Sequence, residues 1–166
     1  MRNIYLVGFM GTGKTTVGKK LAALQKHTFI DLDDLIESKE KRKISDIFAA
    51  RGEPYFRAIE KKALQEVSQK EDLVVGCGGG IVIDKENIAL MKATGKIICL
   101  SATPEIILKR TSGRTHRPLL NVADPKAKIA SLLENRASCY ALADETIDTS
   151  HLSPDEVVKK IISLFS

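Results

Sequence analysis

A glycine-rich segment near the beginning of the chain restricts its possible folds more than any other feature. Residues 8–15 read GFMGTGKT and fit the pattern GxxxxGK[ST] in full. An aliphatic run precedes this segment and a helical pattern follows it, which is the context in which the pattern forms a phosphate-binding loop. The glycines let successive backbone N–H groups face an anion, and the helix N-terminus adds positive potential. The segment therefore predicts a P-loop in an α/β fold.

The rest of the chain alternates between predicted strands and predicted helices. The apolar residues of the strands are nearly continuous rather than alternating, which is typical of a parallel sheet covered on both faces. Parallel strands joined through helices form right-handed crossovers, so the predicted class is α/β. The predicted strands cover residues 4–7, 28–31, 73–76, 97–101 and 146–147.

Three predicted helices have recognisable ends or faces. Val17, Leu21 and Leu24 form an apolar stripe soon after the P-loop. Pro54 is expected in the first turn of a second helix. Residues 153–156 read SPDE, a capping box with proline in the first turn, and predict the start of the last helix.

The P-loop predicts binding of ATP together with Mg²⁺. Lys14 is expected to reach the β- and γ-phosphate oxygens, and the Thr15 hydroxyl is expected to bind Mg²⁺. A GTPase is excluded because no asparagine is followed by lysine, as the guanine-reading NKxD motif requires. A small kinase or a small ATP-dependent binding module remains. The expected nucleotide contacts in this segment are Gly11, Thr12, Gly13, Lys14, Thr15 and Thr16.

Acidic residues follow the second predicted strand. The strand period of two places Asp31 and Asp33 on one side, at the edge of the sheet where open α/β folds bind ligands. A carboxylate there can hold Mg²⁺ through water or accept the proton of an attacking hydroxyl. Acids after a strand are also common helix caps, and Asp34 fits that role. For Asp31 and Asp33 we favour a functional role over capping.

Arginine is scarce, with eight residues against eighteen lysines, so its positions carry information. A guanidinium group binds a carboxylate or phosphate through two parallel hydrogen bonds, which lysine cannot do. Arg57 lies after Pro54, Arg117 lies in a segment without a secondary-structure pattern, and Arg136 lies on a later helical pattern. For each arginine alone, an exposed surface position is the favoured interpretation. Beside a P-loop, an anion site becomes an equally good interpretation of the three together.

Two further segments are unusual. Glycines occupy positions 78–80 directly after the third strand, and such a run indicates that backbone closely approaches another group. Residues 111–124 have no clear secondary-structure pattern, and a loop of this length in a compact domain is often a functional lid.

Together these segments resemble the shikimate kinase family over the whole chain. The P-loop is shared by many kinases, whereas the aspartates after the second strand, the GEPYFR segment and the glycine run are more specific. The matching segments are GFMGTGKTTVGKKLA at 8–22, FIDLDDLIE at 29–37, ISDIFAARGEPYFRAIE at 44–60, GGG at 78–80, RPLL at 117–120, the predicted helix that carries Arg136 and Tyr140, and IDTSHLSPDEVV at 147–158.

The resemblance implies a nucleoside-monophosphate-kinase-like fold of three layers. Its five-stranded parallel sheet would have the order 2-3-1-4-5, with helices on both faces and a mobile lid. The chain would form one kinase domain over residues 1–166, with the substrate-binding region at about 31–60 and the lid at about 111–124. The implied reaction is ATP-dependent phosphorylation of the 3-hydroxyl of shikimate, in aromatic amino-acid biosynthesis.

The resemblance also implies roles for particular residues. Asp33 would contact the accepting hydroxyl, while Lys14 and Arg117 would neutralise charge on the transferred phosphoryl group. Thr15 and Asp31 would serve Mg²⁺. The shikimate site would be formed by Asp33, Arg57, Gly78, Gly79, Gly80 and Arg136. Arg110 and Pro154 would lie near the adenine, and Arg117 would also contact the nucleotide.

Rival functions remain open from the residues alone. Gluconate kinases and nucleoside monophosphate kinases share the implied fold, although a monophosphate acceptor would make little use of Asp33. A nucleotide-switched module that binds nucleic acid has only the net charge of +5 in its favour.

Composition adds expectations about location and assembly. Aromatic residues make up 5% of the chain and tryptophan is absent, so stacking platforms for single strands are scarce. The three cysteines have no spacing typical of a disulfide framework or a zinc site. No segment is long and apolar enough to span a membrane. We therefore expect a cytoplasmic monomer that binds neither nucleic acid nor membranes.

Overall fold

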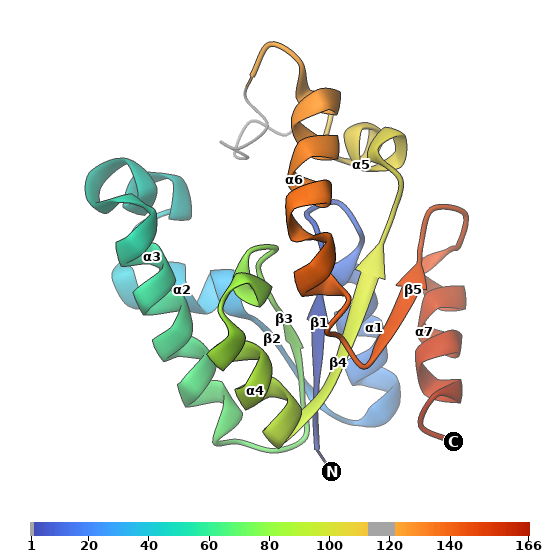
Figure 1. Cartoon of the computed structure of the whole chain (residues 1–166). Helices are drawn as coiled ribbons and strands as arrows, with labels where there is room; N and C mark the ends of the chain where they lie inside the picture. The colour runs from blue at the N-terminus through green and yellow to red at the C-terminus, as the bar shows by residue number, and fades with distance from the viewer. Residues whose placement is uncertain (1, 113–121) are drawn as a thin grey trace.

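The computed structural model describes residues 2–112 and 122–166 and contains a five-stranded sheet in the order β2-β3-β1-β4-β5. All neighbouring strands are parallel. Both features confirm the predicted topology, which is visible in Figure 1. The strands are β1 (Asn3–Val7), β2 (Thr28–Asp31), β3 (Leu73–Gly76), β4 (Gly95–Ser101) and β5 (Glu145–Asp148).

Helices cover both faces of this sheet, as predicted (Figure 1). One face packs against α1 (Lys14–Gln25) and α7 (Pro154–Ser163). The other packs against α2 (Leu32–Glu40), α3 (Ile44–Ser68), α4 (Lys85–Thr94) and α6 (Pro125–Tyr140). The remaining helix is α5 (Pro104–Thr111), and a short 3-10 turn, η1 (Ile81–Ile83), precedes α4.

Strand β1 shows why the apolar pattern of the strands is continuous. All five of its residues are buried. Ile4 and Leu6 pack toward α1 and α7, whereas Tyr5 and Val7 pack toward the helices on the opposite face. Because alternate side chains enter two different cores, residues 4–7 are all hydrophobic and only Asn3 is a buried amide, so the period-two pattern of a half-exposed strand disappears.

Parallel pairing brings the ends of three strands to one edge of the sheet. In β3, Gly76 is paired with Leu6 of β1 and with Asp31 of β2. The P-loop, the start of α2 and the glycine run therefore leave the sheet side by side. This edge carries the candidate site.

The predicted start of α7 is confirmed, whereas the predicted apolar stripe of α1 is partly wrong. The capping box of Ser153 and Glu156 is present at the start of α7. Leu24 was expected in the apolar stripe of α1, but it is 66% exposed, and Gly18 and Ala22 complete the buried face instead. Because Gly18 has no side chain, the Phe29 ring packs directly against the backbone of α1.

The helix α3 begins earlier than Pro54 suggests. It spans Ile44–Ser68, but Gly52 interrupts it with φ 80° and ψ 171°. Pro54 therefore lies in the first turn of the second half, where its missing N–H costs no helical hydrogen bond. Among residues 2–112 and 122–166, no helix is both long and apolar enough to cross a membrane.

Candidate active site

The P-loop connects β1 to α1 through three glycines with positive φ: Gly8 (133°), Gly11 (78°) and Gly13 (95°). The helix α1 begins at Lys14 without a side-chain cap, so its first N–H groups are not bound by a neighbouring side chain. The Nζ atom of Lys14 donates to the carbonyl oxygens of Gly8 (2.6 Å) and Phe9 (2.9 Å). The loop therefore has the positive-φ glycines and the uncapped helix start that the predicted anion-binding nest requires.

Thr15 and Asp31 lie together beside the P-loop. The Thr15 hydroxyl donates to Asp31 Oδ2 over 3.2 Å, while Asp31 Oδ1 accepts the Asp34 N–H over 3.1 Å. Asp31 is therefore the N-cap of α2, and the expectation that Asp34 has this role is wrong. The capping bond uses one carboxylate oxygen and leaves the other toward Thr15. A hydroxyl and a carboxylate oxygen are ligands that fit Mg²⁺.

Asp33 lies in the same site, but it belongs to a helix and not to the strand on which it was expected. The strand β2 ends at Asp31 and α2 begins at Leu32, so a strand period of two does not relate Asp31 to Asp33. Asp33 lies in the first turn of α2, and its Oδ1 is buried without a hydrogen-bond partner among the described residues. Burial and the nearby Asp31 raise the pKa of Asp33 to about 6, against the opposing effect of Lys14.

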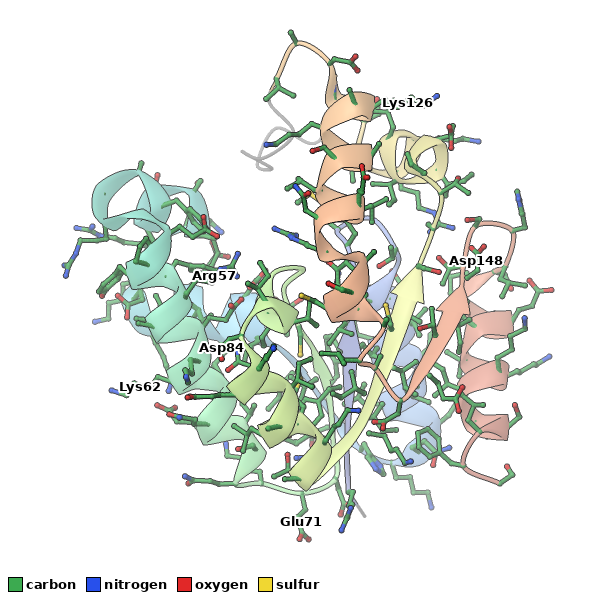
Figure 2. The ribbon with its side chains drawn as sticks, in the orientation of Figure 1. Arg57, Lys62, Glu71, Asp84, Lys126 and Asp148 are labelled. Carbon is green, nitrogen blue, oxygen red and sulfur yellow. The ribbon has the colours of Figure 1, made fainter. Side chains whose placement is uncertain are left out.

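An ion pair between the half-buried Arg57 and the buried Glu60 forms the α3 side of the site. Glu60 is 1% exposed, and its Oε1 accepts a hydrogen bond from Arg57 Nη1 over 2.8 Å. Arg57 also lies 3.3 Å from Glu53 Oε1. Figure 2 shows Arg57 directed toward the segment before α4, whereas Lys62 on the same helix points outward. Burial raises the pKa of Glu60 to about 7, and Arg57 opposes this shift.

The glycine run at 78–80 is where the charged side chains of the site meet. A Cβ on Gly78 would lie 3.1 Å from Asp33 Oδ1 and 3.2 Å from Glu60 Oε2. A Cβ on Gly80 would overlap the guanidinium group of Arg57. The predicted close approach is therefore made by the side chains of this site.

The middle glycine is contacted from α6. A Cβ on Gly79 would lie 3.3 Å from Arg136 Nη1, 3.4 Å from the carbonyl oxygen of Gly8 and 3.5 Å from the Tyr140 hydroxyl. Arg136 is 8% exposed, and its guanidinium carbon lies 5.8 Å from the centroid of the Phe9 ring. Arg57 and Arg136 thus reach the glycine run from different helices.

Arg110 links the P-loop to Thr149, in the segment after β5. Arg110 on α5 donates to the carbonyl of Gly11 (3.2 Å), and to the hydroxyl (3.0 Å) and carbonyl (2.8 Å) of Thr149. The Thr149 hydroxyl contacts the carbonyl of Thr12 over 3.1 Å. Pro154 begins α7 a few residues later, and it is exposed.

Not every predicted site residue is placed by the structure. Arg117 and positions 113–121 of the predicted lid lie outside the described residues. Thr16 is exposed in the first turn of α1. Two residues with clear structural roles, Glu60 and Tyr140, were not among the predicted site residues.

Comparison with known proteins decides the family. The model of the family "Shikimate kinase" matches residues 10–166. The chain belongs to the shikimate kinase family. A shikimate kinase from Thermoanaerobacter pseudethanolicus is 44% identical over 165 residues, which cover 99% of this chain and 96% of that relative.

Solved structures agree with this membership. The shikimate kinase from Acinetobacter baumannii, solved in complex with shikimate, has a TM-score of 0.95 and 38% identity, covering 99% of this chain and 93% of that one. A gluconokinase from Sinorhizobium meliloti has a TM-score of 0.58 and 16% identity, covering 98% and 90% of the two chains, and shows a shared fold alone. The similarity therefore favours shikimate kinases over the gluconate kinases considered from the sequence.

Glu60 gives this shikimate kinase family member an unusual dependence of stability on pH. Its pKa is about 7 in the folded protein, against an ordinary value of 4.5. Between these pH values the folded protein holds a proton that the unfolded chain has released, so stability from Glu60 decreases as the pH rises. Between pH 4.5 and 7.5 the free energy of unfolding should therefore decrease less in Glu60→Gln than in the parent protein. The expected difference is on the order of 1–3 kcal/mol.

Urea unfolding of both proteins across this pH range measures the difference. The quantity to compare is the slope against pH, because the substitution also weakens the bond to Arg57 at every pH. Parallel curves for the parent and Glu60→Gln would show that Glu60 is already ionised near pH 4.5.

Proposed function

We propose that this chain transfers the γ-phosphoryl group of ATP to the 3-hydroxyl of shikimate, giving ADP and shikimate 3-phosphate. The family membership and the full-length similarity to shikimate kinases support this activity. The structural observation that carries it is Asp33, whose buried carboxylate oxygen lacks a partner at the edge of the sheet that holds the P-loop. A hydroxyl that enters beside it is the missing donor.

Asp33 orients the 3-hydroxyl and accepts its proton as the oxygen attacks the γ-phosphorus. A carboxyl group with a pKa of about 6 is largely ionised at neutral pH and is a stronger base than an ordinary aspartate. The bond between the γ-phosphorus and the bridging oxygen breaks as the new bond forms, and ADP leaves. Such a reaction needs little covalent assistance, so position and charge supply most of the rate.

Arg57 and Arg136 bind the carboxylate of shikimate. They approach the glycine run at 78–80 from α3 and α6, and the absence of side chains there leaves room for a ring against the backbone. Glu60 and Glu53 already contact Arg57, which fixes its guanidinium group before the acceptor enters. The acceptor therefore meets a preformed cation and a preformed base.

The nucleotide binds along the P-loop from Gly11 to Thr16. Lys14 and the N–H groups at the start of α1 hold the phosphates, and Arg110 lies on the adenine side with Pro154. Mg²⁺ fits Thr15 and Asp31, and when bound it neutralises charge on the phosphate oxygens. Lys14 turns from the Gly8 and Phe9 carbonyls to the phosphates as the nucleotide enters.

The proposal also covers the extent of the domain, the lid, the oligomeric state and the location of the protein. One kinase domain over residues 1–166 would take its acceptor site from about 31–60 and its lid from about 111–124, with Arg117 acting on the transferred phosphoryl group. We propose a monomer that works in the cytoplasm without nucleic acid or membrane partners. The three free cysteines, Cys77, Cys99 and Cys139, support a reducing compartment.

ADP release from ATP and Mg²⁺, measured with and without shikimate, tests the function. We expect turnover that depends on shikimate and is lost in Lys14→Ala. Gluconate and nucleoside monophosphates serve as alternative acceptors. A folded protein that binds ATP but turns over only with one of these would replace shikimate as the acceptor and leave the P-loop assignment intact.

A further inference from the structure

Tyr140 connects α6 to the glycine run. It is the last residue of α6 and is 9% exposed, and its hydroxyl donates to the carbonyl oxygen of Gly79 over 2.6 Å. Arg136 lies one helical turn earlier, so the two side chains share a face of the helix and both reach Gly79. In Figure 1 the end of α6 lies beside the segment between β3 and α4, which contains η1.

The Tyr140 hydroxyl remains a donor throughout the range in which an enzyme works. Burial raises its pKa to about 12, and the guanidinium group of Arg136 opposes this shift. The bond to Gly79 is short for a neutral hydroxyl and a carbonyl group. The carbonyl is therefore held in one direction.

A fixed Gly79 carbonyl also fixes the N–H of Gly80. The two groups belong to one planar trans peptide, and the structure has no cis peptide in its described residues. They therefore point in opposite directions. The described part of the chain provides no acceptor for the Gly80 N–H. Arg57 lies against the same glycine.

The Gly79–Gly80 peptide needs such a restraint. Glycine has the largest choice of backbone angles, so a run of three has little intrinsic preference for one conformation. The run is bounded by hydrogen bonds from Cys77 N to the Leu6 carbonyl and from Ile81 N to the Gly78 carbonyl. Neither bond fixes the plane of the peptide between Gly79 and Gly80, whereas the Tyr140 hydroxyl does.

We propose that Tyr140 is a positioning residue for acceptor binding. Its hydroxyl sets the direction of the Gly79–Gly80 peptide and thereby the direction of the N–H of Gly80, the glycine against which Arg57 lies. It does so without contacting the acceptor itself. This inference rests on the proposed function, because the molecule held between these groups is the carboxylate-bearing acceptor.

Tyr140→Phe tests the proposal because it removes one oxygen atom and keeps the buried ring. We expect the KM for shikimate to rise about tenfold, as for a lost positioning hydrogen bond, while the KM for ATP stays within a factor of two. Calorimetric titration with shikimate alone should show the same weakening. The amide resonances of residues 79 and 80 should shift in the protein without ligands.

Tyr5→Phe is the matched control. Tyr5 is fully buried, and its hydroxyl shares a 2.7 Å hydrogen bond with the hydroxyl of Thr94, next to the start of β4 and thus at the opposite edge of the sheet. This variant loses a comparable bond, so its thermal midpoint should fall as much as that of Tyr140→Phe or more. Both KM values should remain those of the parent protein.

Three other results would contradict the positioning role of Tyr140. An unchanged KM for shikimate in Tyr140→Phe, with an active parent protein, would overturn the positioning role alone. Equal increases in Tyr140→Phe and Tyr5→Phe would show a general loss of stability and would overturn it too. A parent protein that binds ATP but does not phosphorylate shikimate would overturn both the proposed function and this inference.

Discussion

Asp33→Asn should lower kcat by about 10²- to 10⁴-fold, the range associated with loss of a general base. Asparagine has nearly the same shape, so the acceptor should still bind, but its amide cannot accept the proton of the 3-hydroxyl. The same substitution should stabilise the protein at pH 7.5, by on the order of 1 kcal/mol, because it removes a buried carboxylate oxygen that has no partner among the described residues. Higher stability with lower activity is the signature expected of a group retained for catalysis.

Asp34→Asn is the matched control for this prediction. Asp34 is the exposed neighbour in the same turn of α2, and replacing it should leave kcat within a factor of about two. Steady-state kinetics at saturating ATP and urea unfolding of both variants provide the measurements. Retention of parental kcat in Asp33→Asn would mean that the carboxylate only orients the hydroxyl.

The pH profile of the parent protein gives a second view of Asp33. Its pKa of about 6 means that kcat/KM for the acceptor should decrease as the pH falls below this value, because the protonated carboxyl group is no longer a base.

Arg136→Ala should raise the KM for shikimate by about 10²-fold, since truncating one partner of a buried charged pair commonly costs 2–5 kcal/mol. Arg136 is 8% exposed and lies against Gly79, whereas Arg110 contacts Gly11 and Thr149. The KM for ATP should therefore change little.

Arg110→Ala provides the opposite expectation. Its guanidinium group holds Gly11 and Thr149 on the nucleotide side, so its removal should raise the KM for ATP and leave the KM for shikimate nearly unchanged. Initial rates over a grid of both substrate concentrations separate the two effects. Equal increases in both KM values for Arg136→Ala would place this arginine outside the acceptor site.

The fold was predictable because the central strands β1, β3 and β4 are largely buried between the two helical layers. Continuous apolar runs located β2 and β3 to the residue and missed β4 and β5 by one or two residues at their ends. Leu24 was misplaced because α1 packs through Gly18 and Ala22, and residues this small carry almost no hydrophobic signal. The start of α2 at Leu32 was missed, because Asp34 and not Asp31 was expected to cap this helix.

The site residues were predictable only where the residue type itself indicates a chemical role. The P-loop, the aspartates and the arginines do so, but the role of Glu60 depends on its being buried. One signal was available: Glu60 follows Phe56 by four residues and precedes Ala63 by three, which places a carboxylate on the buried face of α3. Tyr140 gave no comparable signal, because its partner is a backbone carbonyl sixty-one residues away in sequence.

The glycine run at 78–80 has a consequence for the design of inhibitors. A compound that lies against this run would contact main-chain atoms, and main-chain atoms are not altered by most mutations. Substitution by a larger residue at position 80 would displace Arg57, and substitution at position 78 would crowd Asp33 and Glu60. A mutation that blocks such a compound would therefore also displace the groups that we propose bind the acceptor. A resistance mutation at this surface would therefore also reduce the activity of the enzyme. A resistance mutation at an exposed side chain would reduce it less.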